Sequence, residues 1–129
     1  MRAIDTNVLA RFLLDDDPVQ SPVAASVIAG GVAVTHTVIV ELTWLLLSRY
    51  RQPRTVVAAA LREVIDLPSV TVQDTPLVLC AIDRFDGGAD LADMLHIVAA
   101  RDSDSFASFE KQLAKQAGPD TPVPIEQLA

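Results

Sequence analysis

Short apolar runs alternate with longer helical segments along the whole chain, and this alternation constrains the fold more than any other feature. The short runs are rich in Val and Ile, and Gly or Pro residues separate most of the segments. We expect strands at residues 2–5, 32–37, 70–72, 106–109 and 123–125. We expect helices at residues 7–14, 18–28, 38–50, 55–65, 77–85, 90–101 and 111–116. The pattern predicts an α/β fold, a three-layer sandwich in which a mainly parallel, short-stranded sheet is flanked by helices.

Length and composition narrow the class of protein. The chain has 129 residues, half of them hydrophobic, which predicts one domain over 1–129 with a real core. Cys80 is the only cysteine, so no internal disulfide forms, and its apolar surroundings predict a small core residue. We see no signal peptide and no apolar run long enough for a bilayer, so we expect a cytoplasmic protein.

Asp5 is the first candidate functional residue. It ends the apolar run 1–4, which reads as a buried first strand, and helical sequence follows it at once. In α/β folds, ligands and catalytic groups collect at the carboxyl edge of the sheet. We therefore ask which other carboxylates in the chain meet Asp5 there.

Four further acids are candidates. Glu41 lies in a segment that is apolar on most faces, so we expect it to be partly buried; the alternative is a Glu on a solvated stripe. Asp90 and Asp93 share one helix face, and helix capping explains Asp90 equally well but Asp93 less well. Glu110 follows a predicted strand, as Asp5 does. Converging carboxylates would raise one another's pKa, and hard cations such as Mg²⁺ or Mn²⁺ relieve that repulsion.

These acids stand in segments that resemble the motifs of PIN-domain proteins. Residues 3–9, Ala-Ile-Asp-Thr-Asn-Val-Leu, resemble the opening of that family, and Glu41 fits its second acidic position. Residues 90–96 look like the third motif, and residues 106–110 look like the last, usually written Thr-Phe-Asp. The motifs follow one another in the family's order, and the match is nearest to the VapC toxins of bacterial VapBC toxin–antitoxin modules.

The resemblance implies a Mg²⁺- or Mn²⁺-dependent endoribonuclease, the toxin of a type II toxin–antitoxin system. It assigns the metal site and the catalysis to Asp5, Glu41 and Asp93, with Asp90 and Glu110 as further metal-site acids. Glu110 departs from the usual Asp, and its extra methylene moves the charge. Thr6, Asn7 and Ser108 match supporting polar positions. The implied partners are a VapB-like antitoxin, an RNA substrate and a second copy in a homodimer.

The charge of the chain bears on those partners. The net charge of −7 argues against tight binding of a phosphate backbone, whereas it suits a basic antitoxin segment. RNA would still need cationic contacts. The candidates are Arg49, Arg51 and Arg54, with Arg11 near Asp5, and a solvated helix terminus explains the first three equally well.

Two other functions are compatible with parts of the sequence. A non-enzymatic phospho-receiver-like signalling module would use Asp74 as its phosphoacceptor, but Lys111 and Lys115 do not end a late strand. A haloacid-dehalogenase-like phosphatase would need Asp-x-Asp where this chain has Asp5-Thr6-Asn7. The sequence offers no Gly-rich phosphate loop and no metal-type Cys/His spacing, because His36 and His96 are isolated.

Overall fold

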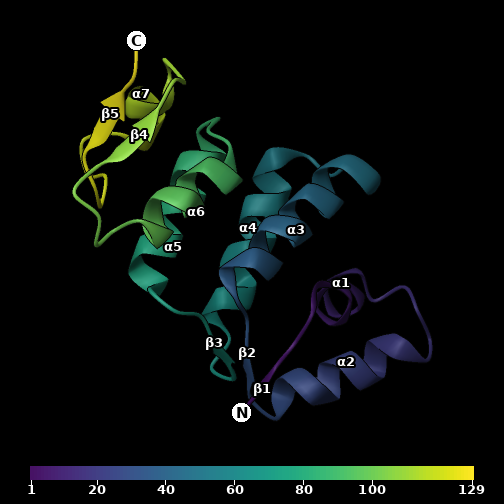
Figure 1. Ribbon diagram of the computed structural model, residues 1–129. Coiled ribbons are helices and arrows are strands. Elements are labelled where there is room, and N and C mark those ends of the chain that lie inside the picture. The colour runs from purple at the N-terminus through teal and green to yellow at the C-terminus, as the bar shows by residue number, and fades with distance from the viewer. The chain divides into compact units, whose positions relative to one another are not determined.

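The computed structural model describes all residues, Met1–Ala129 (Figure 1). In chain order the elements are β1 (Arg2–Ala3), α1 (Thr6–Leu14), α2 (Gln20–Ala29), β2 (Val32–Ala33), α3 (His36–Trp44), the π-helix η1 (Leu45–Arg49), α4 (Arg54–Asp66), β3 (Val70–Thr71), α5 (Thr75–Asp86), α6 (Leu91–Ala99), β4 (Phe106–Ser108), α7 (Leu113–Ala117) and β5 (Ile125–Gln127). None of the helices combines the length and apolar character that crossing a bilayer requires. The chain forms two compact units, Met1–Thr75 and Pro76–Ala129.

The first unit is built on a three-stranded parallel sheet with strand order β1-β2-β3 (Figure 1). Arg2 lies opposite Val32, which lies opposite Val70, so the three strands end at one level. Helices connect each strand to the next, as parallel pairing demands. The carboxyl edge therefore carries Asp5, the start of α3 and the segment after β3.

The core of the first unit comes from one face of each helix and from the central strand. Its largest fully buried side chains are Leu9, Val32, Ile39, Leu42, Val57 and Leu61. Thr35 caps α3, because its Oγ1 accepts a hydrogen bond from the Val38 amide at 3.4 Å. The predicted strand 32–37 is therefore shorter in the structure: β2 ends at Ala33, and Thr35 starts a helix because its hydroxyl caps α3.

Two expectations about this unit are corrected. The first strand is not buried: Arg2 and Ala3 are exposed, because β1 is an edge strand that pairs only with β2. The predicted helix 38–50 is α3 followed by η1, in which the Tyr50 amide donates to the Leu45 carbonyl five residues earlier. Such π turns often mark functional positions.

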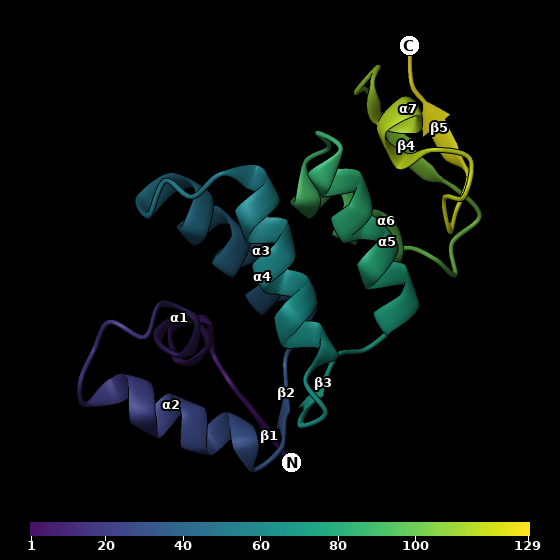
Figure 2. The same cartoon turned by 180° about the vertical axis from the view of Figure 1, so that it is seen from behind.

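The second unit contains α5, α6 and a small β4-α7-β5 motif. Strands β4 and β5 pair in parallel, with Phe106 opposite Ile125 and Ser108 opposite Gln127. Both views show α7 beside this pair (Figures 1 and 2). Among its fully buried side chains are Val78, Ile82, Phe85, Ile97 and Val123. All strand pairs are parallel, so the predicted α/β class with short parallel strands flanked by helices is confirmed.

Candidate functional site

Asp5 caps the first helix of the chain. Its Oδ1 accepts a hydrogen bond from the Val8 amide at 3.0 Å, and its backbone is extended, as an N-cap residue requires. Its second carboxylate oxygen has no protein partner, and the side chain is exposed. Thr6, the first residue of α1, is buried, whereas Asn7 is exposed. Capping therefore fixes one oxygen of Asp5 and leaves the other available at the carboxyl edge of the sheet.

Glu41 is exposed, so the expectation of partial burial is wrong. The helix α3 buries Ile39, Leu42 and Thr43, and the 3.6-residue period turns Glu41 away from that stripe. Trp44 follows on the outer face and is 63% exposed. The Glu41 carboxylate forms no hydrogen bond or ion pair within its unit. The solvated-stripe alternative describes its environment, and such an environment leaves both oxygens free to bind a ligand.

In the second unit, a sharp turn between α5 and α6 places Asp90. The Ala89 amide donates to the Arg84 carbonyl and the Gly88 amide to the Phe85 carbonyl, each at 3.0 Å. This is the Schellman pattern, and Gly88 has the positive φ of 117° that it needs. Asp90 then caps α6, because its Oδ2 accepts from the Asp93 amide at 2.9 Å. The predicted capping role of Asp90 is confirmed.

Asp93 lies in the first turn of α6 and is half-buried. Its carboxylate accepts no hydrogen bond. Burial is the largest cause that raises the pKa of Asp93, and the negative charge of Asp90 adds to it. His96 opposes the shift, and Glu110 again raises the pKa. The second unit therefore holds two acids, Asp90 and Glu110, whose negative charges act on the carboxylate of Asp93.

Glu110 follows β4 and is exposed. Its amide donates to the hydroxyl of Ser108 at 3.0 Å, and its Oε1 accepts from the Gln112 amide at 3.3 Å. Ser108 therefore holds the backbone at Glu110, and its supporting role in a metal site stays a prediction. The charge of Glu110 remains without a basic partner.

The chemical type of the candidate ligands suits a divalent cation. Asp5, Glu41, Asp90, Asp93 and Glu110 all offer carboxylate oxygens, the ligands that Mg²⁺ and Mn²⁺ prefer. None of them forms an ion pair within its own unit. No group of three or more His, Cys, Asp or Glu side chains in the structure is arranged to hold a metal ion. The assignment of these acids to one metal site stays a prediction.

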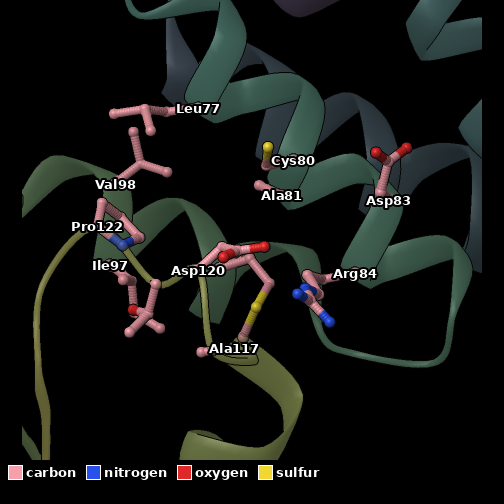
Figure 3. Close-up of a pocket in the computed structure, with 12 residues that line it drawn as sticks. Leu77, Cys80, Ala81, Asp83, Arg84, Ile97, Val98, Ala117, Asp120 and Pro122 are labelled. Carbon is pink, nitrogen blue, oxygen red and sulfur yellow. The ribbon is translucent and has the colours of Figure 1, made fainter.

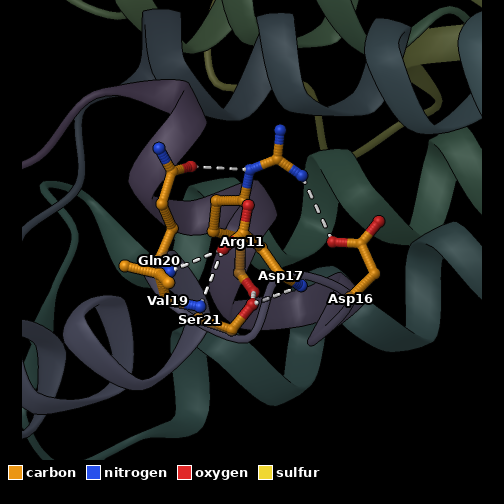
Figure 4. Close-up of polar contacts among 6 residues, drawn as sticks. All are labelled: Arg11, Asp16, Asp17, Val19, Gln20 and Ser21. Atoms are coloured by element: carbon orange, nitrogen blue, oxygen red, sulfur yellow. Dashed lines mark hydrogen bonds and ion pairs between the residues drawn. The ribbon is translucent and has the colours of Figure 1, made fainter.

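Arg11, predicted to bind RNA, serves the fold of the first unit (Figure 4). Its guanidinium pairs with Asp16 at 3.2 Å and donates to Gln20 Oε1 at 3.0 Å. Asp17 accepts from the amides of Val19 and Gln20, at 2.9 and 2.7 Å. Residues 15–17 therefore form the loop between α1 and α2, and their side chains bond to residues of both helices and to Val19.

The other three arginines lie around the end of η1. Arg49 and Arg51 are exposed, and Arg51 has a positive φ of 50°. Arg54 is half-buried and is the first residue of α4. Positive charge at Arg49 also suits the carboxyl end of a helix, so RNA binding by this group stays a prediction.

The sequence was compared with protein-family models, with curated proteins and with solved structures. A family model described as PIN domain matches residues 3–119, a range that includes most of both units and all five acids. No curated protein and no solved structure gives a significant match. PIN domains are generally nucleases, and they typically use divalent metal ions. Because the model matches most of the chain, the protein belongs to the PIN-domain family.

Proposed function

We propose that this protein is a metal-dependent endoribonuclease of the VapC type, the toxin of a type II toxin–antitoxin module. Asp5, Glu41 and Asp93 carry the proposal, because each lies in a segment that resembles a family motif and none forms an ion pair with a basic residue of its own unit. A structural acid is normally hydrogen-bonded or ion-paired when it is partly buried. Half-buried Asp93 has neither kind of partner, and its raised pKa is the state that a bound cation would relieve.

The residues of the chain divide the work as follows. Asp5, Glu41 and Asp93 would hold the cation, with Asp90 and Glu110 adding negative charge. Asp5 is oriented by its bond to the Val8 amide, and Ser108 holds the backbone at Glu110. When bound, a divalent cation stabilises charge on a phosphodiester and lowers the pKa of a water molecule. Attack by water with departure of the 3′ oxygen leaves a 5′-phosphate and a 3′-hydroxyl.

The proposed partners follow from charge and exposed apolar surface. A VapB-like antitoxin would offer a basic segment to a chain whose net charge is −7. RNA would be contacted by Arg49, Arg51 and Arg54. A homodimer would cover apolar side chains that lie open in the first unit, where Trp44 is 63% and Val56 48% exposed.

Cleavage of RNA by the purified protein tests the proposal. The wild type should cut single-stranded RNA with Mg²⁺ or Mn²⁺ and not with EDTA, and its expression should arrest growth. Asp5→Asn, Glu41→Gln and Asp93→Asn should each remove at least about 99% of the activity, the scale on which charged groups at a reacting phosphate act. Asp104→Asn is the matched control, because Asp104 is an exposed loop acid. Full activity of Asp5→Asn, with contaminating nuclease excluded, would overturn the proposal.

The phospho-receiver alternative receives no support from the family match. Lys111 precedes α7 and Lys115 lies within it, so no lysine ends a strand. Stable phosphorylation of Asp74 by acetyl phosphate would favour the phospho-receiver function instead.

A further inference from the structure

A cavity of about 240 Å³ lies wholly within the second unit (Figure 3). Its walls come from α5, α6 and the segment 117–122, which are distant in sequence. Leu77, Ile97, Val98 and Pro122 supply apolar surface, whereas Arg84 and Asp120 supply opposite charges. Apolar walls with a few convergent polar groups are typical of a site for a small ring.

Arg84 is the residue of this cavity whose hydrogen-bond donors have no partner in the structure. Its guanidinium is half-buried, yet it forms no hydrogen bond or ion pair. It lies directly over Gly118, where an added Cβ would overlap it, and Gly118 has a φ of 75°. The backbone at Gly118 therefore accommodates the guanidinium, while its N–H donors remain available. A guanidinium presents these donors as a rigid planar fork.

Asp120 is the complementary group. Its carboxylate is exposed, and the structure gives it no hydrogen bond or ion pair. The neighbouring Thr121 hydroxyl donates to the Val123 carbonyl at 2.8 Å, which fixes the segment that carries Asp120. The cavity therefore offers a fork of donors from α5 and a pair of acceptors from the segment before β5.

This combination selects against a simple anion. The Asp120 carboxylate lines the cavity together with the Arg84 guanidinium, so a phosphate or carboxylate would meet a negative charge as well as a positive one. A neutral flat ring with acceptors on one edge and donors on another fits better. Among RNA bases, guanine has O6 and N7 acceptors, which arginine binds with two bonds, and an N2 amino donor, which a carboxylate accepts.

We propose that this cavity binds an unpaired guanine base of RNA, with Arg84 on O6 and N7 and Asp120 on the N1–N2 edge. The inference rests on the proposed function, since it assigns a base preference to that RNA substrate. The turn at Gly87 to Asp90 places the Arg84 end of α5 next to the start of α6, where Asp90 and Asp93 lie. A base held by Arg84 would therefore lie near the start of α6, which carries Asp90 and Asp93.

Equilibrium binding of mononucleotides tests the cavity without any cleavage. The full-length protein is titrated in EDTA with guanosine, adenosine and inosine 5′-monophosphates, which carry the same phosphate. We expect guanosine monophosphate to bind roughly tenfold more tightly than adenosine monophosphate. Inosine monophosphate lacks the N2 amino group and should bind at an intermediate affinity. Amide NMR signals of residues 77–84 and 117–122 should shift together.

Variants then assign the contacts. Arg84→Gln should abolish the preference for guanine over adenine, and Asp120→Asn should abolish the preference for guanine over hypoxanthine. Lys115→Gln removes the same charge as Arg84→Gln from an exposed position on α7 and should leave both preferences unchanged. Circular dichroism checks that each variant is folded. Arg84→Lys should bind guanosine monophosphate more tightly than Arg84→Gln but less tightly than the wild type, because Lys cannot form the planar fork of donors.

The outcomes separate this inference from the proposed function. Equal binding of all three nucleotides, or an Arg84→Gln profile identical to that of Lys115→Gln, would overturn the guanine site even if RNA is cleaved. Selective guanine binding that Arg84→Gln abolishes would support the site even if the wild type cuts no RNA. In an active enzyme, the same variant should lose cleavage next to guanine while it retains cleavage of other linkages.

Discussion

The Asp90 carboxylate accepts a hydrogen bond from the Asp93 amide at 2.9 Å, and its negative charge adds to burial, the larger cause, in raising the pKa of the Asp93 carboxylate. One residue thus stabilises the start of α6 and destabilises the ionised form of its neighbour. Asp93 lies in the first turn of α6, where the helix dipole favours an acid, but it is half-buried and its carboxylate accepts no hydrogen bond. The pair combines a structural role at Asp90 with an electrostatic cost at Asp93.

Replacement of Asp90 separates its two roles. Asp90→Ser and Asp90→Ala both remove the charge, but only Ser keeps an oxygen that can cap α6. We expect the Ala variant to be less stable than the Ser variant by about 1 kcal/mol, the usual value of an N-cap. Urea unfolding of both proteins measures the difference. Equal midpoints would show that the bond to the Asp93 amide contributes nothing to stability.

Asp93→Asn should stabilise the protein near neutral pH in the absence of divalent ions. The folded pKa of Asp93 lies above its usual value of 3.8, so ionisation of this carboxylate destabilises the folded state as pH rises above 3.8. The variant should therefore have a higher unfolding temperature than the wild type at pH 7, and the gain should shrink as pH falls below 4. Thermal melts at both pH values test this, with Asp104→Asn as a control that shows no gain.

Much of the helical framework follows from the sequence, because apolar periodicity and breaks at Gly or Pro mark it locally. Gly30 ends α2 and Pro53 precedes α4, as the sequence predicts. Strand ends are less well predicted, because Val-rich segments favour a strand while Thr35 starts a helix. The π turn of η1 has no residue signature, since it arises from a shift in the partner of the Leu45 carbonyl.

Some features of the candidate site could also be predicted from local sequence, and others could not. The cap at Asp90 is predictable from the sequence, because capping involves residues close in the chain, whereas the metal-site role of Asp5 and the supporting role of Ser108 stay predictions. Glu41 differs, because an apolar helix still buries only the stripe that faces its core. Cys80, expected in the core, is exposed at the cavity of the second unit. That cavity could not be predicted, because its walls come from three separate segments.

Asp17→Asn should destabilise the first unit at neutral pH. Hydrogen bonds from the amides of Gln20 and then Val19 hold the pKa of Asp17 below its usual 3.8, with a smaller effect of Arg11. The corresponding stability is present above that pH and is lost as pH falls through the folded pKa. The wild type should therefore melt at a higher temperature than the variant at pH 7, and the difference should close in strong acid. Asp15→Asn, with no side-chain bond in this loop, serves as the control.

Addition of Mn²⁺ or Mg²⁺ should raise the unfolding temperature of the wild type, because a ligand that binds only the folded state stabilises it. At one hundred times the dissociation constant, the gain is about 2.7 kcal/mol. Asp5→Asn and Asp93→Asn should lose most of this gain, whereas Asp104→Asn should keep it, and EDTA should reverse it. Calorimetric melts at several metal concentrations measure the effect. An equal rise in all four proteins would mean that the ion acts on exposed carboxylates in general, and the assignment of Asp5 and Asp93 as ligands would fall.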